Sequence, residues 1–135
     1  MKSEFQRLRK LCDSLHSVYV RARDNRRFGG ICPICRMRPI ECAFHFLGRA
    51  KMATRWHDDN VVGACCECNR LEFVSRGDSA KERWRLHHIA LVGLERRAEL
   101  EALAQATADF DVAQLKDLAA AIRVKIKNVW SEVIE

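Results

Sequence analysis

The amino-acid sequence predicts a small α+β protein with a long N-terminal helix, a middle section of two short strands and one helix, and a C-terminal helical pair. The chain has 135 residues, which suits a single domain. Apolar residues recur at three- and four-residue steps near both ends of the chain, as in amphipathic helices. In between, Gly, Pro and Cys interrupt residues 31–75, and no long helical period survives there. We therefore divide the single domain into a basic N-terminal helix (1–28), a core (29–79) and a helical tail (80–135).

The N-terminal helix is predicted from an apolar stripe that begins at Phe5 and continues past Leu15. Ser3 precedes the stripe and is a suitable N-cap. We expect the helix to end before Gly29, because glycine commonly terminates helices. Cys12 lies within the apolar stripe, so packing in the core is its expected role.

Two strand-like stretches, residues 42–47 and 60–64, precede a helix that we expect to start near Cys66. In the tail, one apolar stripe runs from Trp84 to Leu103 despite Gly93. Asp111 and Gln114 then form a capping-box pattern that marks the start of the last helix. We expect these two tail helices to pair antiparallel and to pack on the rest of the chain, although their stripes also suit docking to a partner subunit.

The charge of the chain is concentrated near its N-terminus. Lys and Arg number 24 against 18 acidic residues, a formal charge of +6, and residues 1–30 hold eight basic and three acidic residues, or +5. Such a local excess suits contact with a polyanion such as nucleic acid, although a solvated helix face can have the same composition. No apolar run reaches the roughly 18 residues of a membrane span. The charged N-terminus does not resemble a signal peptide, so we expect a cytoplasmic protein without membrane contact.

Seven cysteines are many for a chain of this length, and an odd number without a signal peptide fits a reducing compartment better than a secreted disulfide framework. Two C-x-x-C knuckles predict a tetrahedral, structural Zn²⁺ with a closed shell of four sulfurs. The predicted ligands are Cys32, Cys35, Cys65 and Cys68. A redox pair among unrelated cysteines is the alternative, and Cys66 competes with Cys65, although the two-residue gap favours Cys65. Cys42 is either a core residue or a spare thiol.

Three polar residues lie between and just after the knuckles. His45 sits in the first strand-like stretch, Asn60 opens the second, and Asn69 follows the last knuckle cysteine. This order, framed by zinc knuckles, resembles that of the ββα-metal (HNH, or His-Me finger) nucleases. The resemblance implies a general base at His45, an orienting residue at Asn60, and a ligand at Asn69 for a catalytic Mg²⁺ or Mn²⁺ on the scissile phosphate.

Within that superfamily, the chain resembles the phage NinG (Rap) recombination endonucleases over most of its length. The motifs that carry the resemblance are residues 18–24, 44–46, 53–56, 59–61, 65–70 and 111–116, with the last helix continuing to residues 125–127. The resemblance implies an HNH-type endonuclease that acts on branched recombination intermediates such as Holliday junctions and D-loops. It also implies a phage or prophage protein in a bacterial host. Because branched DNA has near two-fold symmetry, a homodimer would match it.

Basic side chains around the proposed site are expected to contact DNA phosphates, for which arginine is better suited than lysine. The expected contacts are Arg21, Arg23, Arg26, Arg27, Arg49, Lys51, Arg55 and Arg70. In a protein that does not bind DNA, the same charges would simply be solvated. Trp56 and Trp84 are expected in the core rather than as platforms for base stacking, and His87 and His88 are expected to pack or to lie at the surface.

One position departs from the HNH pattern, because Phe44 stands where many members place an Asp or His metal ligand. Asn69 would then hold the metal with waters and phosphate oxygens, which Mg²⁺ tolerates. His57, Asp58 or Asp59 would be the alternative ligands, although the two aspartates are more typical of a turn. Two other functions stay open on the sequence alone. One is a zinc-stabilised protein that binds DNA structures without cutting them, and the other is a recombination accessory protein that docks partners through its helical tail.

Overall fold

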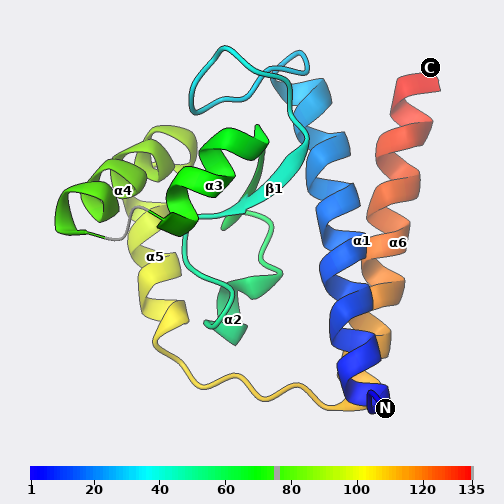
Figure 1. Cartoon of the computed structure of the whole chain (residues 1–135). Coiled ribbons are helices and arrows are strands. Elements are labelled where there is room, and N and C mark those ends of the chain that lie inside the picture. Colours follow the sequence, from blue (N-terminus) through cyan, green and yellow to red (C-terminus); the bar gives the residue numbers. More distant parts are fainter. Residues whose placement is uncertain (75–76, 135) are drawn as a thin grey trace.

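The computed structural model describes residues 1–74 and 77–134, and Figure 1 shows their arrangement. The chain is mostly helical, with a two-stranded sheet at its centre. Its elements are α1 (Glu4–Arg27), β1 (Cys42–His45), α2 (Met52–Arg55), β2 (Val61–Ala64), α3 (Cys66–Val74), α4 (Asp78–Val92), α5 (Leu94–Ala104) and α6 (Val112–Ile134). The α+β class and the order of strand, strand and helix in the core are therefore confirmed. No helix in the described part of the chain has both the length and the apolar character needed to cross a bilayer.

The expected helix starts are present at both ends of the chain. The hydroxyl of Ser3 accepts the backbone N–H of Gln6, and the side chain of Gln6 accepts the backbone N–H of Ser3, which completes a capping box. Asp111 and Gln114 exchange the same pair of hydrogen bonds at the start of α6. These reciprocal bonds satisfy amide groups that the first turn of a helix leaves without partners.

The two strands pair antiparallel, with Cys42 opposite Ala64 and His45 opposite Val61. In Figure 1 the strands lie between α1 on one side and α4 with α5 on the other, and α1 contacts both strands. Successive residues of a strand point to opposite faces. Phe44 is therefore buried against Phe46 and Trp84, whereas His45 faces the other side of the sheet.

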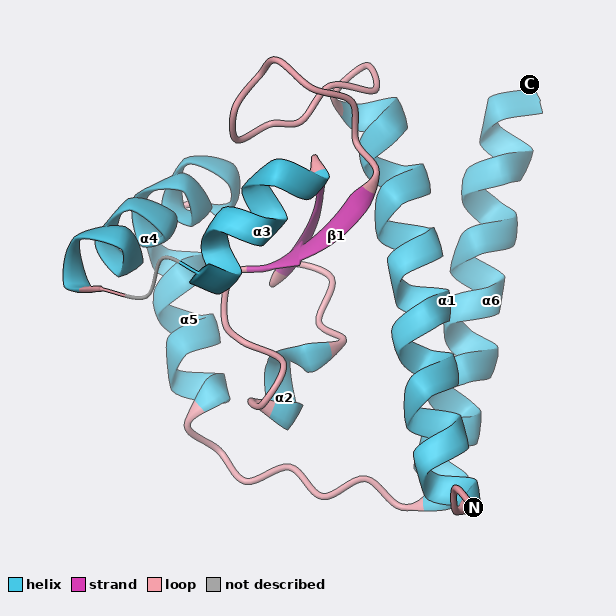
Figure 2. Cartoon of the chain, in the orientation of Figure 1, coloured by secondary structure: helices cyan, strands magenta, loops and turns pink. Residues whose placement is uncertain are grey.

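The predicted antiparallel pair of tail helices is wrong. Gly93, at a φ of +92°, divides the first tail helix into α4 and α5, because few residues other than glycine adopt this conformation. An extended loop then runs from α5 to the N-terminal end of α1, where α6 begins (Figure 2). From there α6 runs parallel to α1, with Lys116 paired to Glu4 near one end and Glu132 paired to Arg26 near the other.

The apolar stripes of α1 and α6 account for this pairing. Cys12, Leu115 and Ala119 are buried together with Trp56, and Phe5 and Leu8 pack against them. The stripe of α6 therefore covers the stripe of α1, and α5 stays with α4. The core roles expected for Cys12, Trp56 and Trp84 are confirmed, since all three side chains are buried.

His88 ties α4 to the loop before β2. Its Nε2–H donates to the carbonyl of Asp59 at 2.7 Å, while Nδ1 accepts a hydrogen bond from Arg97 at 3.0 Å. The ring stacks on Phe46 with 4.2 Å between centroids. Burial lowers the pKa of His88 to about 4, so the ring is neutral near pH 7. His88 is thus a packing residue, as expected, and His87 is half-buried.

The helix α1 approaches β2 so closely that only glycine fits at residue 63. Asp24 is fully buried and accepts the backbone N–H of Gly63 at 2.7 Å as well as two hydrogen bonds from Arg23. A Cβ atom on Gly63 would lie 2.8 Å from Cγ2 of Ile40 and 3.1 Å from Cβ of Asp24. These distances leave no room for a methyl group in the packed interior.

We expect Gly63→Ala to lower the free energy of unfolding by about 1–3 kcal/mol, because α1 and Ile40 must move to admit the new methyl group. Urea denaturation measures this change. Gly48→Ala is the matched control, since a Cβ atom there would meet nothing within 4 Å. Equal stability of the two variants would contradict the proposed close packing.

Asp58 joins α1 and α6 to the loop before β2. Its carboxylate accepts a hydrogen bond from the buried His16 at 3.1 Å and one from Lys125 at 2.6 Å. Burial alone would raise the pKa of Asp58, but these two partners outweigh it and lower the pKa to about 2.

A lowered carboxyl pKa stabilises the fold above pH 4, where the unfolded chain is also ionised, and this stabilisation is lost as the pH falls toward 2. We therefore expect Asp58→Asn to reduce the free energy of unfolding by about 2 kcal/mol near pH 7. The difference between wild type and variant should shrink below pH 4. Urea titrations at several pH values measure it, and a difference that does not depend on pH would contradict the role of this charge.

Candidate functional site

The first cysteine knuckle is a tight hairpin between Gly30 and Ile40. The backbone N–H of Cys32 donates to the carbonyl of Arg38 at 2.8 Å, and the N–H of Arg36 donates to the carbonyl of Cys32 at 2.9 Å. Gly29 and Gly30 both have positive φ angles, of 64° and 81°. The backbone freedom of glycine at these two positions therefore lets the chain turn from α1 into the knuckle.

The second knuckle meets the first at the end of β2, where four cysteines form a cluster that can hold a metal ion. The Sγ atoms of Cys32, Cys35, Cys65 and Cys68 all lie within 4.8 Å of one another. The Sγ atoms of Cys35 and Cys65 are 3.7 Å apart. Four sulfurs at the usual Zn–S distance of about 2.3 Å would be about 3.8 Å apart in a tetrahedron. The donor set and its dimensions therefore fit a structural Zn²⁺.

The thiols of this cluster are unlike one another. Burial alone would raise the pKa of the Cys35 thiol, but hydrogen bonds from the backbone N–H groups of Met37 and Arg38 outweigh this effect. The pKa of Cys35 is lowered to about 6. Burial and the adjacent sulfur of Cys65 raise the pKa of Cys68. Four thiolates this close repel one another, so a bound cation is what would allow all of them to ionise.

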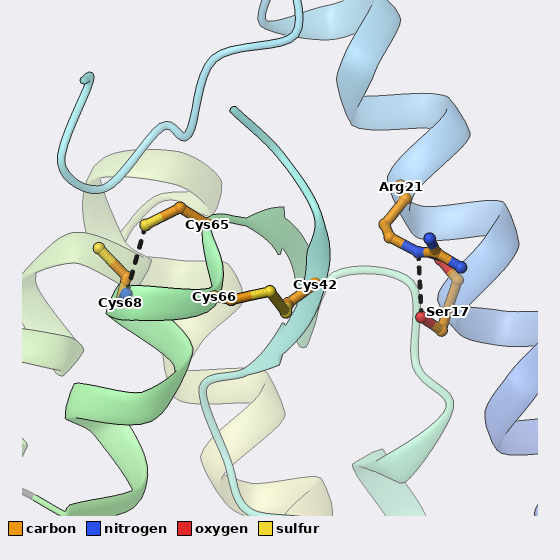
Figure 3. The surroundings of a disulfide bond; sticks show 6 residues. All are labelled: Ser17, Arg21, Cys42, Cys65, Cys66 and Cys68. Carbon is orange, nitrogen blue, oxygen red and sulfur yellow. Dashed lines mark hydrogen bonds between the residues drawn. A yellow bond between two sulfur atoms is a disulfide. The ribbon is translucent and has the colours of Figure 1, made fainter. Parts of the chain in front are cut away.

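Cys66, the alternative ligand, takes no part in the cluster. It forms a disulfide with Cys42, with 5.3 Å between the Cα atoms, and so joins β1 to the first turn of α3 (Figure 3). Figure 3 also shows the neighbouring hydrogen bond from the N–H of Cys68 to the sulfur of Cys65, which is 3.3 Å long. The spacing argument for Cys65 agrees with this geometry. The disulfide was not expected, because a gap of 24 residues carries no signal of pairing in the sequence.

An open groove of about 880 Å³ lies between α1 and α3, across the face of β1 that carries His45. His45 lies in this groove with Asn69 of α3, which is half-buried. Arg21 of α1 and Arg49 of the following loop also line it. The groove thus brings together one candidate base, one candidate metal ligand and two candidate phosphate contacts.

The imidazole of His45 has a fixed tautomer. Its Nε2 lies 3.1 Å from the backbone carbonyl of Arg55, which can only accept a hydrogen bond, so Nε2 carries the proton. Nδ1 is then the acceptor. Burial and the charge of Arg49 lower the pKa of His45 to about 4, which keeps the ring neutral near pH 7. Within the described residues no hydrogen bond engages Nδ1, and a neutral imidazole can accept a proton there.

Asn60 acts on the loop after β1. Its amide nitrogen donates to the carbonyls of Leu47 and Thr54, each at 3.0 Å, and its oxygen accepts the N–H of Leu47 at 2.8 Å. Within the described residues, no hydrogen bond joins Asn60 to the ring of His45. The orienting role of Asn60 therefore stays a prediction. If Asn60 affects His45, it does so through the backbone of residues 47 and 54, which its side chain binds.

The alternative metal ligands lie elsewhere. Asp58 and Asp59 line a small cavity of about 140 Å³ on the other side of the sheet, where they pair with Lys125 and Arg96. His57 accepts the backbone N–H of Asp59 at 3.1 Å, which is typical of the turn that the two aspartates were expected to form.

The predicted DNA-contacting residues fall into two groups. Arg23 and Arg55 have mostly buried side chains that bind internal partners, which are Asp24 for Arg23 and Asp13 for Arg55. Contact of either with DNA stays a prediction that would require an internal ion pair to open. The other group has side chains that reach solvent or the groove, and consists of Arg21, Arg26, Arg27, Arg49, Lys51 and Arg70.

Sequence reasoning overlooked several residues of the groove. Asp13, Ser17 and Glu72 line it, yet none was singled out. Glu72 follows Asn69 by three residues on α3, a spacing that places both on one helix face and that the sequence already contained. Asp13 gave no comparable signal, because it reaches the groove only through the packing of α1 on the loop after β1.

Comparisons with known proteins identify no relative of this chain. No protein-family model matches it, no curated protein matches it, and no solved structure is significantly similar to it.

The cysteine cluster predicts that the chain, purified without chelator, contains about one Zn²⁺ per molecule. Cys65→Ser should reduce the zinc content and the thermal stability, because it removes one of four ligands. The matched control is the double variant Cys42→Ser with Cys66→Ser, which should keep its zinc since neither residue belongs to the cluster. Elemental analysis measures zinc. A metal-free wild type, or a control that loses zinc while Cys65→Ser keeps it, would contradict the assignment.

Proposed function

We propose that this protein is a metal-dependent DNA endonuclease of the HNH (ββα-metal) type, with His45 as its general base. The observation that carries the proposal is the tautomer of His45, which lines the same groove as Asn69: the carbonyl of Arg55 binds Nε2, so Nδ1 is the acceptor. The order of strand, strand and helix is the order that the resemblance to these nucleases implied. This order is consistent with the proposal.

In the proposed reaction, Nδ1 of His45 takes a proton from a water molecule, whose oxygen forms a bond to phosphorus. The bond from phosphorus to the 3′-oxygen breaks, and the leaving oxygen takes a proton from solvent. Asn69 would hold the Mg²⁺ or Mn²⁺ ion, which when bound stabilises the charge that builds on the phosphate. A neutral His45 suits this role, because a protonated ring could not accept the proton.

The zinc cluster would hold the groove rather than take part in chemistry. A shell closed by four sulfurs leaves no position for water or substrate. Asn69 directly follows Cys68 and its backbone N–H donates to the carbonyl of Cys65 at 3.2 Å, so the cluster fixes the start of α3. Zinc would thereby set the distance between Asn69 and His45.

Phosphate contacts are assigned first to Arg21 and Arg49, which line the groove. The Nε–H of Arg21 donates to the backbone carbonyl and to the hydroxyl of Ser17. Within the described residues, no hydrogen bond engages the two terminal nitrogens of Arg21. These can bind a phosphate as a fork. Arg26, Arg27, Lys51 and Arg70 would extend the contact outside the groove. The proposal also includes branched recombination DNA as the substrate and a homodimer as the oligomeric state. It further includes a phage or prophage origin and a location in the bacterial cytoplasm. All of these rest on the resemblance to NinG endonucleases.

The alternative function is DNA binding without cleavage. Phe44 favours it, because this side chain is buried in the core on the face of the sheet opposite His45, where it cannot ligate a metal in the groove. Asn69 would then be the one ligand expected from the resemblance. Docking of partners through the tail has less support, since the buried stripe of α6 already covers α1.

A nicking assay on branched and linear DNA with Mg²⁺ or Mn²⁺ tests the proposal. Wild type should cut, and His45→Ala should cut about 100-fold more slowly or worse while still binding DNA, because it lacks the proton acceptor. Asn69→Ala should need a higher concentration of Mg²⁺ or Mn²⁺. Intact substrate with persistent binding in the wild type would favour the alternative.

His87→Ala is the matched control for this assay, because His87 is a half-buried histidine on α4 that does not line the groove. This variant should cut at the wild-type rate. Cleavage by His45→Ala at the same rate as His87→Ala would reject His45 as the base.

A further inference from the structure

Asp13 of α1 is the centre of a hydrogen-bond cluster beside the groove. Its Oδ1 accepts from Nε of Arg55 and from the indole N–H of Trp56, each at 2.9 Å. Its Oδ2 accepts from Arg55 at 2.6 Å and from Arg49 at 2.7 Å. One half-buried carboxylate therefore receives four hydrogen bonds, all from the segment between β1 and β2.

This cluster leads directly to His45. Asp13 binds the guanidinium of Arg55 through two nitrogens. The backbone carbonyl of the same Arg55 accepts a hydrogen bond from the Nε2–H of His45 at 3.1 Å. The same guanidinium donates to the carbonyl of Arg49 at 2.9 Å, which folds the loop back on itself. Asp13 of α1 thus holds the side chain of Arg55, while the backbone carbonyl of Arg55 binds the imidazole of His45.

We propose that Asp13 is a positioning residue for His45: by holding Arg55 and Trp56, it keeps the carbonyl of Arg55 on Nε2 and so keeps Nδ1 as the acceptor in the groove. The importance of this role for cleavage rests on the proposed function, since it requires His45 to be the base. The fixed tautomer itself does not depend on cleavage.

The chemistry of the cluster requires a carboxylate. Four donors converge on two oxygens, and an ionised carboxylate can accept all four. The amide of asparagine would turn an NH₂ group toward donors of Arg55, Trp56 or Arg49. The pKa of Asp13 reflects the fit, because burial would raise it, yet the hydrogen bonds and charges of Arg55 and Arg49 lower it below its ordinary value.

The partners of Asp13 differ in exposure. The side chain of Arg49 is 56% exposed, whereas that of Arg55 is only 11% exposed. Arg49 can therefore leave Asp13 for a phosphate while Arg55 and Trp56 stay bound. Loss of Asp13 should accordingly impair the chemical step more than DNA binding.

The experiment compares Asp13→Asn with wild type in the full-length, zinc-loaded protein. Long-range ¹H–¹⁵N NMR of labelled histidine reports which ring nitrogen of His45 carries the proton. We expect Nε2–H in the wild type and a shift toward a mixture of tautomers in Asp13→Asn. In cleavage assays we expect kcat to fall roughly 10- to 100-fold, because a displaced base loses its alignment, with little change in KM.

Asp58→Asn is the matched control. It also removes a carboxylate that binds a residue of α1, but the partners of this carboxylate are His16 and Lys125, and neither Arg55 nor Trp56 binds it. It should leave the tautomer of His45 and kcat unchanged at a temperature well below the melting points of both variants. Arg55→Lys provides a second route, since it loses the two-pronged bond to Asp13, and it replaces Asp13→Asn if that variant does not fold.

The outcomes separate this inference from the proposed function. A wild type that does not cut DNA, with the tautomer of His45 altered by Asp13→Asn and not by Asp58→Asn, rejects the nuclease and supports the positioning role. An unchanged tautomer in both Asp13→Asn and Arg55→Lys overturns the positioning role. So does a wild-type kcat in Asp13→Asn when the wild type cuts.

Discussion

Four cysteine sulfurs converge within 4.8 Å of one another, and this cluster joins the two ends of the middle section of the chain. It brings the knuckle at residues 32–35 against the one at residues 65–68. Since β2 ends at Ala64 and α3 starts at Cys66, the cluster also fixes where the second strand stops and the helix begins. Thiolates at this spacing repel one another without a cation, so metal binding and folding of this section would be coupled. The position of Asn69, one residue after the cluster, follows from it.

The helix α1 provides the second layer of organisation, through polar residues rather than through its apolar stripe alone. Asp24 holds the backbone of β2 at Gly63, His16 binds Asp58 in the loop before β2, and Asp13 binds Arg55 at the end of α2. These contacts lie along one helix and reach three different segments of the chain. A buried or half-buried charge without its partner is costly, so each contact favours one register of α1 against the sheet.

The charge of the N-terminal segment divides in the folded chain. Arg23 is used inside the protein, on Asp24 and on the carbonyls of Asp58 and Val61. Arg26 and Arg27 stay at the surface, where α6 supplies Glu132 as a partner for Arg26. Under the proposed function, the +5 of residues 1–30 would provide the long-range field that attracts a polyanion, and direct contacts would come from the fewer side chains that remain exposed.

The features that depend on local spacing could be predicted from the sequence: α1 with its cap at Ser3, the strands around His45 and Val61, the four clustered cysteines, and the cap of α6 at Asp111. Periodicity, capping and C-x-x-C spacing are properties of neighbouring residues, so they can be read along the chain. Three features became visible only in the folded chain: α6 pairs with α1, Cys42 joins Cys66, and Asp13 reaches the segment bound to His45. An apolar stripe, a thiol or a carboxylate accepts any complementary partner, and which partner is near depends on how the whole chain packs.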